Sequence, residues 1–459
     1  MSSLWDRYTS PEMSDVFSKK YVLWRKLWYS LAYNERELGV SISAEQLAEM
    51  KSHIYDIDWV RAEQLEKETH HDVVAHLRTY AEACPKAAPI IHLGATSCYI
   101  TNNADMIMMQ DAMDLIKDKL KILIDELCAF AETMADVEIT GRTHFQPAQP
   151  TTVGKRAALW TQDFVMDLEN LKYQYKNLKP LGCKGATGTC DSFLKLFNGD
   201  QKAVRQLDRN ICREFGFQDP VDVSGQTYTR KQDFYVLQTL SGIAQSASKM
   251  ATDIRMMSGL GESYEEVGEL QVGSSAMPYK KNPMLCERIC GLARLVICGL
   301  QNAAITASSQ WLERSLDDSS NRRILIPEMF MGIDAVLSTC LQVIKGLYVN
   351  DDIIDRNLIL QKPWAASEGI LMTCVSRGGD RQKLHEKLRQ YATQHPNTMI
   401  GSVMKDPDFN ITADEIEKLV FQKNCGLARC QTEEYVNKVR VNELQEPEAG
   451  VPSRSPTNT

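Results

Sequence analysis

The sequence predicts an all-α protein of three helical domains with a central bundle of five long helices. Apolar residues recur at alternating spacings of three and four over stretches of about 25 residues, which is typical of helices that pack against one another. No alternation of strands with helices and no Val/Ile-rich strand run competes with this pattern. The length of 459 residues corresponds to roughly three domains.

Each long helix is predicted from its own apolar stripe. The stripes cover residues 106–130, 153–178, about 234–257, 286–303 and 330–344. A helix of 25 residues is roughly 37 Å long, so we expect an elongated bundle. The fifth helix is expected to start after Pro327, because proline suits the first turn of a helix. These stripes indicate architecture and carry no chemistry.

The remaining segments divide the chain around this bundle. We expect an N-terminal helical domain at 1–98, the bundle at 99–349 and a C-terminal helical domain at 350–442. Residues 443–459 are rich in Pro, Ser and Thr and are predicted to be disordered.

Composition and charge exclude several classes of protein. Hydrophobic residues make up 43% and charged residues 24%, as in ordinary globular proteins, which excludes collagen-like and wholly disordered chains. The formal net charge of −8 provides no general basic field, so neither nucleic acid nor an anionic membrane is an expected partner. An anionic ligand would need a local cluster of positive charge.

Targeting and cysteine patterns favour a cytoplasmic protein. The N-terminus lacks a basic region followed by an apolar one, and no stretch approaches the ~18 apolar residues of a membrane span. The thirteen cysteines contain no CxxC pair, which favours reduced, buried thiols over zinc sites. No metal site is predicted.

Two polar loops contain histidines suited to proton transfer, and a third contains a pair of serines. His144 lies between Gly141 and Pro147, in a loop expected to open the second long helix, where an acid or base is well placed; the alternative is a structural histidine. His71 and Asp72 could form a carboxylate–imidazole pair, or only a surface pair of no consequence. Ser274 and Ser275 lie in a Gly-rich loop flexible enough to close over a ligand, but two serines in such a loop indicate no function on their own.

Cationic residues gather in the later loops, at Lys280, Lys281, Arg288, Arg314, Arg322 and Arg323. In a chain of net charge −8, their convergence would suit a small ligand with several carboxylate or phosphate groups. The alternative is that they are solvated side chains at helix ends. Neither GxxxxGK[ST] nor GxGxxG is present, so a nucleotide-cradling loop of those kinds is not supported.

Several of these segments resemble a known family. GSSAMPYKKNP at 273–283 resembles the GSSxMPxKxNP loop of the fumarase/aspartase superfamily, whose members are homotetrameric all-α lyases that eliminate fumarate. Within it, DRYTSPEM at 6–13, HDVVAH at 71–76, THFQPAQPTTVGKR at 143–156 and ERSLDDSSNRR at 313–323 resemble the adenylosuccinate lyase family in its animal-type form.

This resemblance implies a role for each matching residue. His144 would be the general acid and Ser274 the general base, with His71 as a third catalytic residue. The implied substrate contacts are Arg7, Tyr8, His70, Asp72, Thr96, Ser97, Thr143, Gln226, Lys280, Asn282, Arg288, Arg314, Ser319 and Arg323. Three positions depart from the family pattern: His70 in place of Arg, Asn102 in place of an acidic residue, and Asp380 in place of Ser.

The implied reaction is β-elimination of fumarate from adenylosuccinate, giving AMP, and from the aminoimidazole ribotide that carries the same succinyl group. It requires no cofactor or metal, and each site of the homotetramer would be shared between subunits. One alternative is another fumarate-releasing lyase, such as argininosuccinate lyase; the RYTSPEM and HDVVAH segments favour a nucleotide instead. The other is a non-catalytic helical-bundle relative, against which the presence of both His144 and Ser274 argues.

Overall fold

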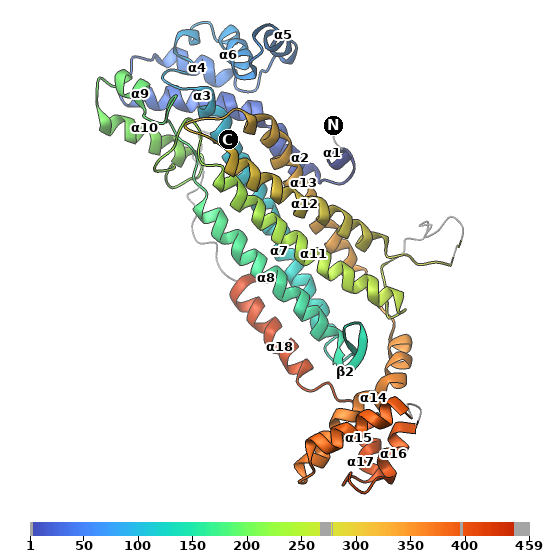
Figure 1. Cartoon of the computed structure of the whole chain (residues 1–459). Coiled ribbons are helices and arrows are strands. Elements are labelled where there is room, and N and C mark those ends of the chain that lie inside the picture. The colour runs from blue at the N-terminus through green and yellow to red at the C-terminus, as the bar shows by residue number, and fades with distance from the viewer. Residues whose placement is uncertain (1–2, 267–276, 278, 395–397, 445–459) are drawn as a thin grey trace.

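Five long helices run side by side along the molecule (Figure 1), and the prediction of an all-α bundle is confirmed. The structure is a computed structural model that describes residues 3–266, 277, 279–394 and 398–444. The bundle helices are α7 (Ser97–Thr133), α8 (Val153–Asn177), α11 (Lys231–Gly259), α12 (Met284–Ser309) and α13 (Asp317–Lys345). Helix α7 packs along α8, and α12 packs along both α11 and α13.

The apolar stripes form the core of this bundle. In α7 the stripe from Met106 to Leu127 has no exposed surface at its seam positions, and in α8 Val153, Phe164 and Leu168 are likewise fully buried. The alternating 3–4 spacing holds these side chains on the side of each helix that faces its neighbours. The stripes thus determine which face of each long helix is buried.

The predicted start of the fifth long helix is wrong. Helix α13 begins earlier, at Asp317, and Pro327 lies inside it. Asp317 and Asp318 occupy the first turn, where negative charge is favourable at a helix N-terminus. Proline leaves the carbonyl four residues before it without a helical partner, and that residue, Arg323, is exposed, so water can supply the missing bond.

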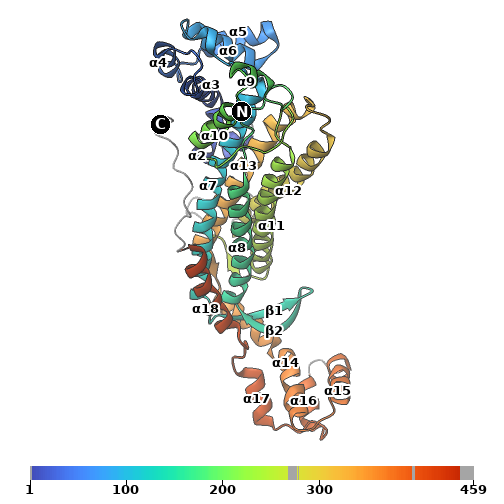
Figure 2. The ribbon, with the colours of Figure 1, turned by 90° about the vertical axis from the view of Figure 1, so that its left-hand side faces the viewer.

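Residues 138–152 form a β-hairpin instead of the expected loop. Strands β1 (Glu138–Thr143) and β2 (Gln146–Thr152) pair antiparallel around His144 and Phe145, whose φ angles are +54° and +61°. Two central residues with positive φ match the primed turns of two-residue hairpins. His144 therefore lies at the tip of a hairpin that projects from the bundle (Figure 2) and does not open the second long helix.

Shorter elements cover the two ends of the bundle (Figure 1). At the end where α7 begins lie α1 (Ser3–Arg7), α2 (Pro11–Ser18), α3 (Lys20–Glu37), α4 (Ala44–Ser52), α5 (Trp59–Thr69), α6 (Asp72–Ala83) and the 3₁₀ turn Ala88–Ile90. Helices α9 (Asp191–Leu196) and α10 (Gln201–Glu214) follow α8 in the chain, and α10 packs against α3.

At the opposite end lie α14 (Asp351–Ser376), α15 (Arg381–Gln394), α16 (Met399–Lys405) and α17 (Ala413–Phe421), which have a small apolar core of their own. A two-stranded sheet, β3 (Ser263–Tyr264) with β4 (Tyr348–Val349), joins the bundle to this region. Helix α18 (Ala428–Val439) packs back onto α8 and α7, and a π-helical turn follows at Arg440–Leu444. The division into three domains stays a prediction, and residues 445–459 lie outside the described residues.

Two bundle helices have the length and hydropathy of a membrane span, contrary to the expectation that no stretch approaches it. The 18-residue windows of α12 and α13 have mean hydropathies of 1.5 and 1.6. In α13 67% of the window is buried inside the chain, as expected for a core helix, against 33% in α12. Helix α12 therefore has an apolar face that its own chain does not cover, including Leu295 and Ile305, which are 49% and 58% exposed.

Candidate active site

The chain places the predicted site residues in three separate regions. The first region lies where α7 begins and contains His71, Asp72, Ser97, Gln226, Arg314 and Arg323, which we call the His71 cluster. The second contains Arg7, Tyr8 and Arg288, and the third is the hairpin tip with Thr143 and His144. Ser274 lies outside the described residues.

The His71 cluster is built on two helix starts. His71 is the N-cap of α6: its Nδ1 accepts from the Val74 amide at 3.5 Å, and its Nε2 lies 3.5 Å from Ser97 Oγ in the first turn of α7. Arg323 Nη2 donates to Asp72 Oδ2 at 2.5 Å, whereas His71 Nδ1 is 3.7 Å from the Asp72 carboxylate. The Asp72 carboxylate therefore binds Arg323 more closely than it binds His71.

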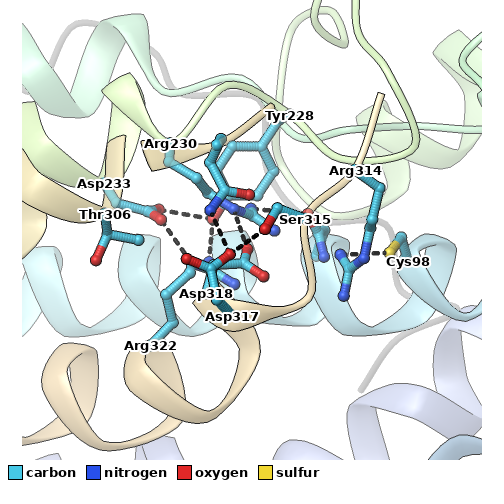
Figure 3. Close-up of polar contacts among 12 residues, drawn as sticks. Cys98, Tyr228, Arg230, Asp233, Thr306, Arg314, Ser315, Asp317, Asp318 and Arg322 are labelled. Atoms are coloured by element: carbon cyan, nitrogen blue, oxygen red, sulfur yellow. Dashed lines mark hydrogen bonds and ion pairs between the residues drawn. The ribbon is translucent and has the colours of Figure 1, made fainter. Parts of the chain in front are cut away.

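Arg314 is held in this cluster by a thiol that sequence reasoning missed. Its Nη1 lies 3.0 Å from Cys98 Sγ (Figure 3). The Cys98 thiol in turn lies 3.5 Å from Gln226 Oε1. Burial raises the pKa of the Cys98 thiol, although Arg314 lowers it. A neutral thiol can accept from the guanidinium while donating to the amide oxygen. The only sequence signal for Cys98 was its place directly after Ser97.

The loop that carries Arg314 is also held by a backbone hydrogen bond to the loop that contains Gln226. The Gln226 amide donates to the Glu313 carbonyl at 3.0 Å. A Cβ at Gly225 would lie 2.5 Å from that carbonyl oxygen, so only glycine permits this approach. Cys98 and this backbone bond together fix the guanidinium of Arg314 against the start of α7.

Beneath the cluster lies a buried network of charges (Figure 3). Arg322 is 7% exposed and forms ion pairs with Asp233 at 2.6 Å and with Asp105 at 3.0 Å, and it donates to the Tyr228 hydroxyl at 2.5 Å. Its pKa is raised well above the usual value, because these partners outweigh the cost of burial. The network ties the first turns of α13 to α7 and α11.

A second arginine completes the network. Arg230 Nε donates to Asp318 Oδ2 at 2.6 Å, and its Nη1 donates to Asn102 Oδ1 at 2.9 Å. Asn102, one of the three departures from the family pattern, thus supplies a neutral acceptor here. Buried pairs of this kind give the sequence no periodic signal, so Arg230, Asp233 and Asp318 were not identified from it.

A narrow pocket of about 40 Å³ opens between the cluster and the network. The predicted residues Arg314, Ser319 and Arg323 line it, and so does Lys20, from the start of α3, which sequence reasoning also missed. Lys20 has no sequence signal beyond its basic side chain within the predicted N-terminal helical domain.

The other predicted contacts near this end have backbone roles that fix their positions. Thr96 is the N-cap of α7, and His70 ends α5 in the left-handed conformation, with φ +50°. In the second region the guanidinium groups of Arg7 and Arg288 lie 5.5 and 5.8 Å from the Tyr8 ring centre. Lys280 and Asn282 directly precede α12, where their backbone groups bond to Met277 and Met284.

The hairpin is at the far end of α7 from the His71 cluster. Helix α7 has 37 residues, and at 1.5 Å per residue it separates the two regions by about 55 Å. At that end a cavity of about 690 Å³ lies between the hairpin and α14, with Arg142, Lys155, Arg156 and Glu368 in its lining. One chain therefore does not bring His144 together with the His71 cluster.

Nothing in the described part of the chain forms a ready metal site. Among those residues, no group of three or more His, Cys, Asp or Glu side chains is placed to hold a metal ion. The His71 cluster contains two guanidinium groups, an imidazole and a hydroxyl group beside the single carboxylate of Asp72, and this excess of positive charge suits an anionic ligand.

Comparison with known proteins identifies the family. A family model described as "Lyase" matches residues 7–298. The adenylosuccinate lyase of Saccharomyces cerevisiae is 43% identical over 96% of this chain and 94% of its own, and that of Schistosoma mansoni is 45% identical over 84% and 81%. The fold matches 3-carboxy-cis,cis-muconate lactonizing enzyme from Pseudomonas putida with a TM-score of 0.83 at 22% identity, over 96% of this chain and 99% of that one. The chain is therefore an enzyme that belongs to the adenylosuccinate lyase family of the fumarase/aspartase superfamily.

Proposed function

We propose that this enzyme eliminates fumarate from adenylosuccinate, giving AMP. The observation that carries the proposal is the convergence of Arg314, Ser319 and Arg323 on one pocket, in a chain 43% identical to an adenylosuccinate lyase over nearly its whole length. A substrate with a phosphate and two carboxylates needs such local positive charge in a chain of net charge −8. The aminoimidazole ribotide with the same succinyl group is the proposed second substrate.

The proposed chemistry uses a base and an acid on different segments. Ser274 removes the weakly acidic proton beside a succinyl carboxylate, and the resulting doubly charged intermediate is stabilised by cations such as Lys280. His144 then protonates the leaving amine, a step worth about 10²–10⁴-fold in rate. Serine is a weak base, so its loop must be electropositive and closed to water when it acts.

The proposed site is assembled from several subunits of a homotetramer. Its support is geometric: about 55 Å of helix separates His144 from the His71 cluster within one chain. Exposed apolar side chains on the bundle provide surfaces for association. On α12 these are Leu295 and Ile305, and on α8 they are Leu159, Met166 and Tyr173, which follow one another at intervals of seven residues. A cytoplasmic location stays a prediction.

A direct experiment tests the activity. We expect purified protein mixed with adenylosuccinate to change its ultraviolet absorbance as AMP and fumarate form, with no change when argininosuccinate replaces it. Turnover of argininosuccinate alone would assign the enzyme to a different lyase of the superfamily. Absence of turnover with both substrates and with the ribotide would support a non-catalytic relative.

A further inference from the structure

We propose that Lys20 is a further substrate-binding residue, which together with Arg314, Ser319 and Arg323 holds a compact oxyanion of the substrate. The inference rests on the proposed function, and it adds a residue to which the family resemblance assigns no role. Lys20 is the first residue of α3, a helix whose first turn contains no acidic residue. A cation is electrostatically unfavourable at a helix N-terminus, so an anion nearby would relieve it.

The pocket has the size of a single acidic group. Its volume is about 40 Å³, and its lining comes from α3, α7, the loop before α11, the loop before α13 and the start of α13. A cavity needs roughly 10–15 Å³ to hold one water molecule, so this one holds about three. A phosphate or carboxylate fits such a space, whereas the base and sugar of a nucleotide must lie outside it.

The pairing of charges leaves two cations available in this pocket. Of its five cationic side chains, Arg322 and Arg230 are neutralised by buried carboxylates, and Arg323 pairs with Asp72. Within the described ranges, no carboxylate lies within 4.0 Å of the charged nitrogens of Lys20 or Arg314. These two unpaired cations enter one pocket from different elements, as a binding site for an anion requires.

The aromatic surroundings of Lys20 hold its ammonium group in place. Its Nζ lies 5.2 Å from the ring centre of Tyr21 and 5.0 Å from that of Trp24, within the range of cation–π attraction. Burial lowers the pKa of Lys20, an effect opposed by Asp105 and reinforced by Arg323. A bound oxyanion would stabilise the partly desolvated ammonium group of Lys20, and this attraction would strengthen binding of the anion.

Calorimetric titration of the full-length protein with AMP, adenosine and fumarate tests the proposal. We expect Lys20→Met to weaken AMP binding about tenfold, which corresponds to about 1.4 kcal/mol, and to leave adenosine binding unchanged. Lys20→Arg should bind AMP nearly as the unmodified protein does. The matched control is Lys19→Met, because Lys19 is 58% exposed at its side chain and pairs with Asp15 away from the pocket.

The outcomes separate the possible anions and roles. Weaker AMP binding alone assigns the pocket to the phosphate, and weaker fumarate binding alone assigns it to a succinyl carboxylate. Unchanged affinity for both anions, or an equal loss with adenosine, would overturn the proposal. If the unmodified protein fails to turn over adenylosuccinate while Lys20→Met still weakens AMP binding, the proposed reaction is wrong but the anion pocket stands.

Discussion

The guanidinium of Arg323 lies 2.5 Å from the Asp72 carboxylate, and both groups are predicted to contact the substrate. We expect Arg323→Met to weaken binding of adenylosuccinate by about 1.5–3 kcal/mol, because it removes a charge-assisted contact and takes from Asp72 its nearest cationic partner. The measurement is KM at low ionic strength. Arg61→Met is the control, since Arg61 pairs with Glu82 at the surface and its loss should not change KM. An unchanged KM for Arg323→Met would return Arg323 to the class of solvated helix-end cations.

A base and a binding group should respond differently to substitution. We expect Ser274→Ala to lower kcat by several orders of magnitude while the affinity for AMP stays close to that of the unmodified enzyme, because separate residues bind and react. Ser275→Ala, one position away, should reduce kcat much less. Turnover of the Ser274 variant near the normal rate would remove serine from the role of base.

At the scale of a helix, α3 contains an acidic side chain whose ionised form is unfavourable in the folded protein. Glu35 has no exposed surface, and neither carboxyl oxygen has a hydrogen-bond partner among the described residues. Burial raises its pKa from 4.5 to about 9. Between these two values the folded chain keeps a proton that the unfolded chain releases, so stability should fall as the pH rises through this window.

Replacing Glu35 by Gln should remove this dependence. We expect the Tm of Glu35→Gln to fall less between pH 6 and pH 8.5 than that of the unmodified protein, as measured by scanning calorimetry, because the amide is neutral throughout. Glu37→Gln, at an exposed position of the same helix, should follow the unmodified protein. Parallel curves for all three proteins would show that Glu35 is ionised in the folded state.

Elements also differ in how far the sequence predicts them. The bundle helices follow from apolar spacing, because every seam residue of α7 from Met106 to Leu127 must be buried for the bundle to form. The hairpin gave no such signal: its strands contain Gln, Pro and Thr, and its turn depends on positive φ at His144 and Phe145. Motif residues identified the family, but the contacts of Lys20 and Cys98 depend on tertiary packing that no local pattern records.

At the scale of the whole molecule, the bundle separates two groups of residues that the proposed reaction needs together. Helix α7 places about 55 Å between Ser97 and the hairpin that carries His144. Only 33% of the apolar window of helix α12 is buried inside its own chain. Both features are accounted for if bundles from several chains pack together, so that the hairpin of one chain approaches the His71 cluster of another.

Shared sites predict that two inactive variants can restore each other. If different subunits supply His144 and Ser274, then His144→Ala and Ser274→Ala chains unfolded and refolded together should form mixed tetramers. Each site then receives an intact His144 about half of the time and an intact Ser274 about half of the time. Under random symmetric assembly, activity should return to about a quarter of that of the unmodified enzyme.

The controls make this outcome specific to a shared site. Each variant refolded alone should stay inactive, and differential tags on the two chains should show that mixed tetramers form. If one chain supplied both groups, no mixture could contain a complete site, because every chain lacks one of them. Mixed tetramers without activity would therefore mean that His144 and Ser274 act from the same chain, and the 55 Å of α7 would then require another subunit to supply the His71 cluster.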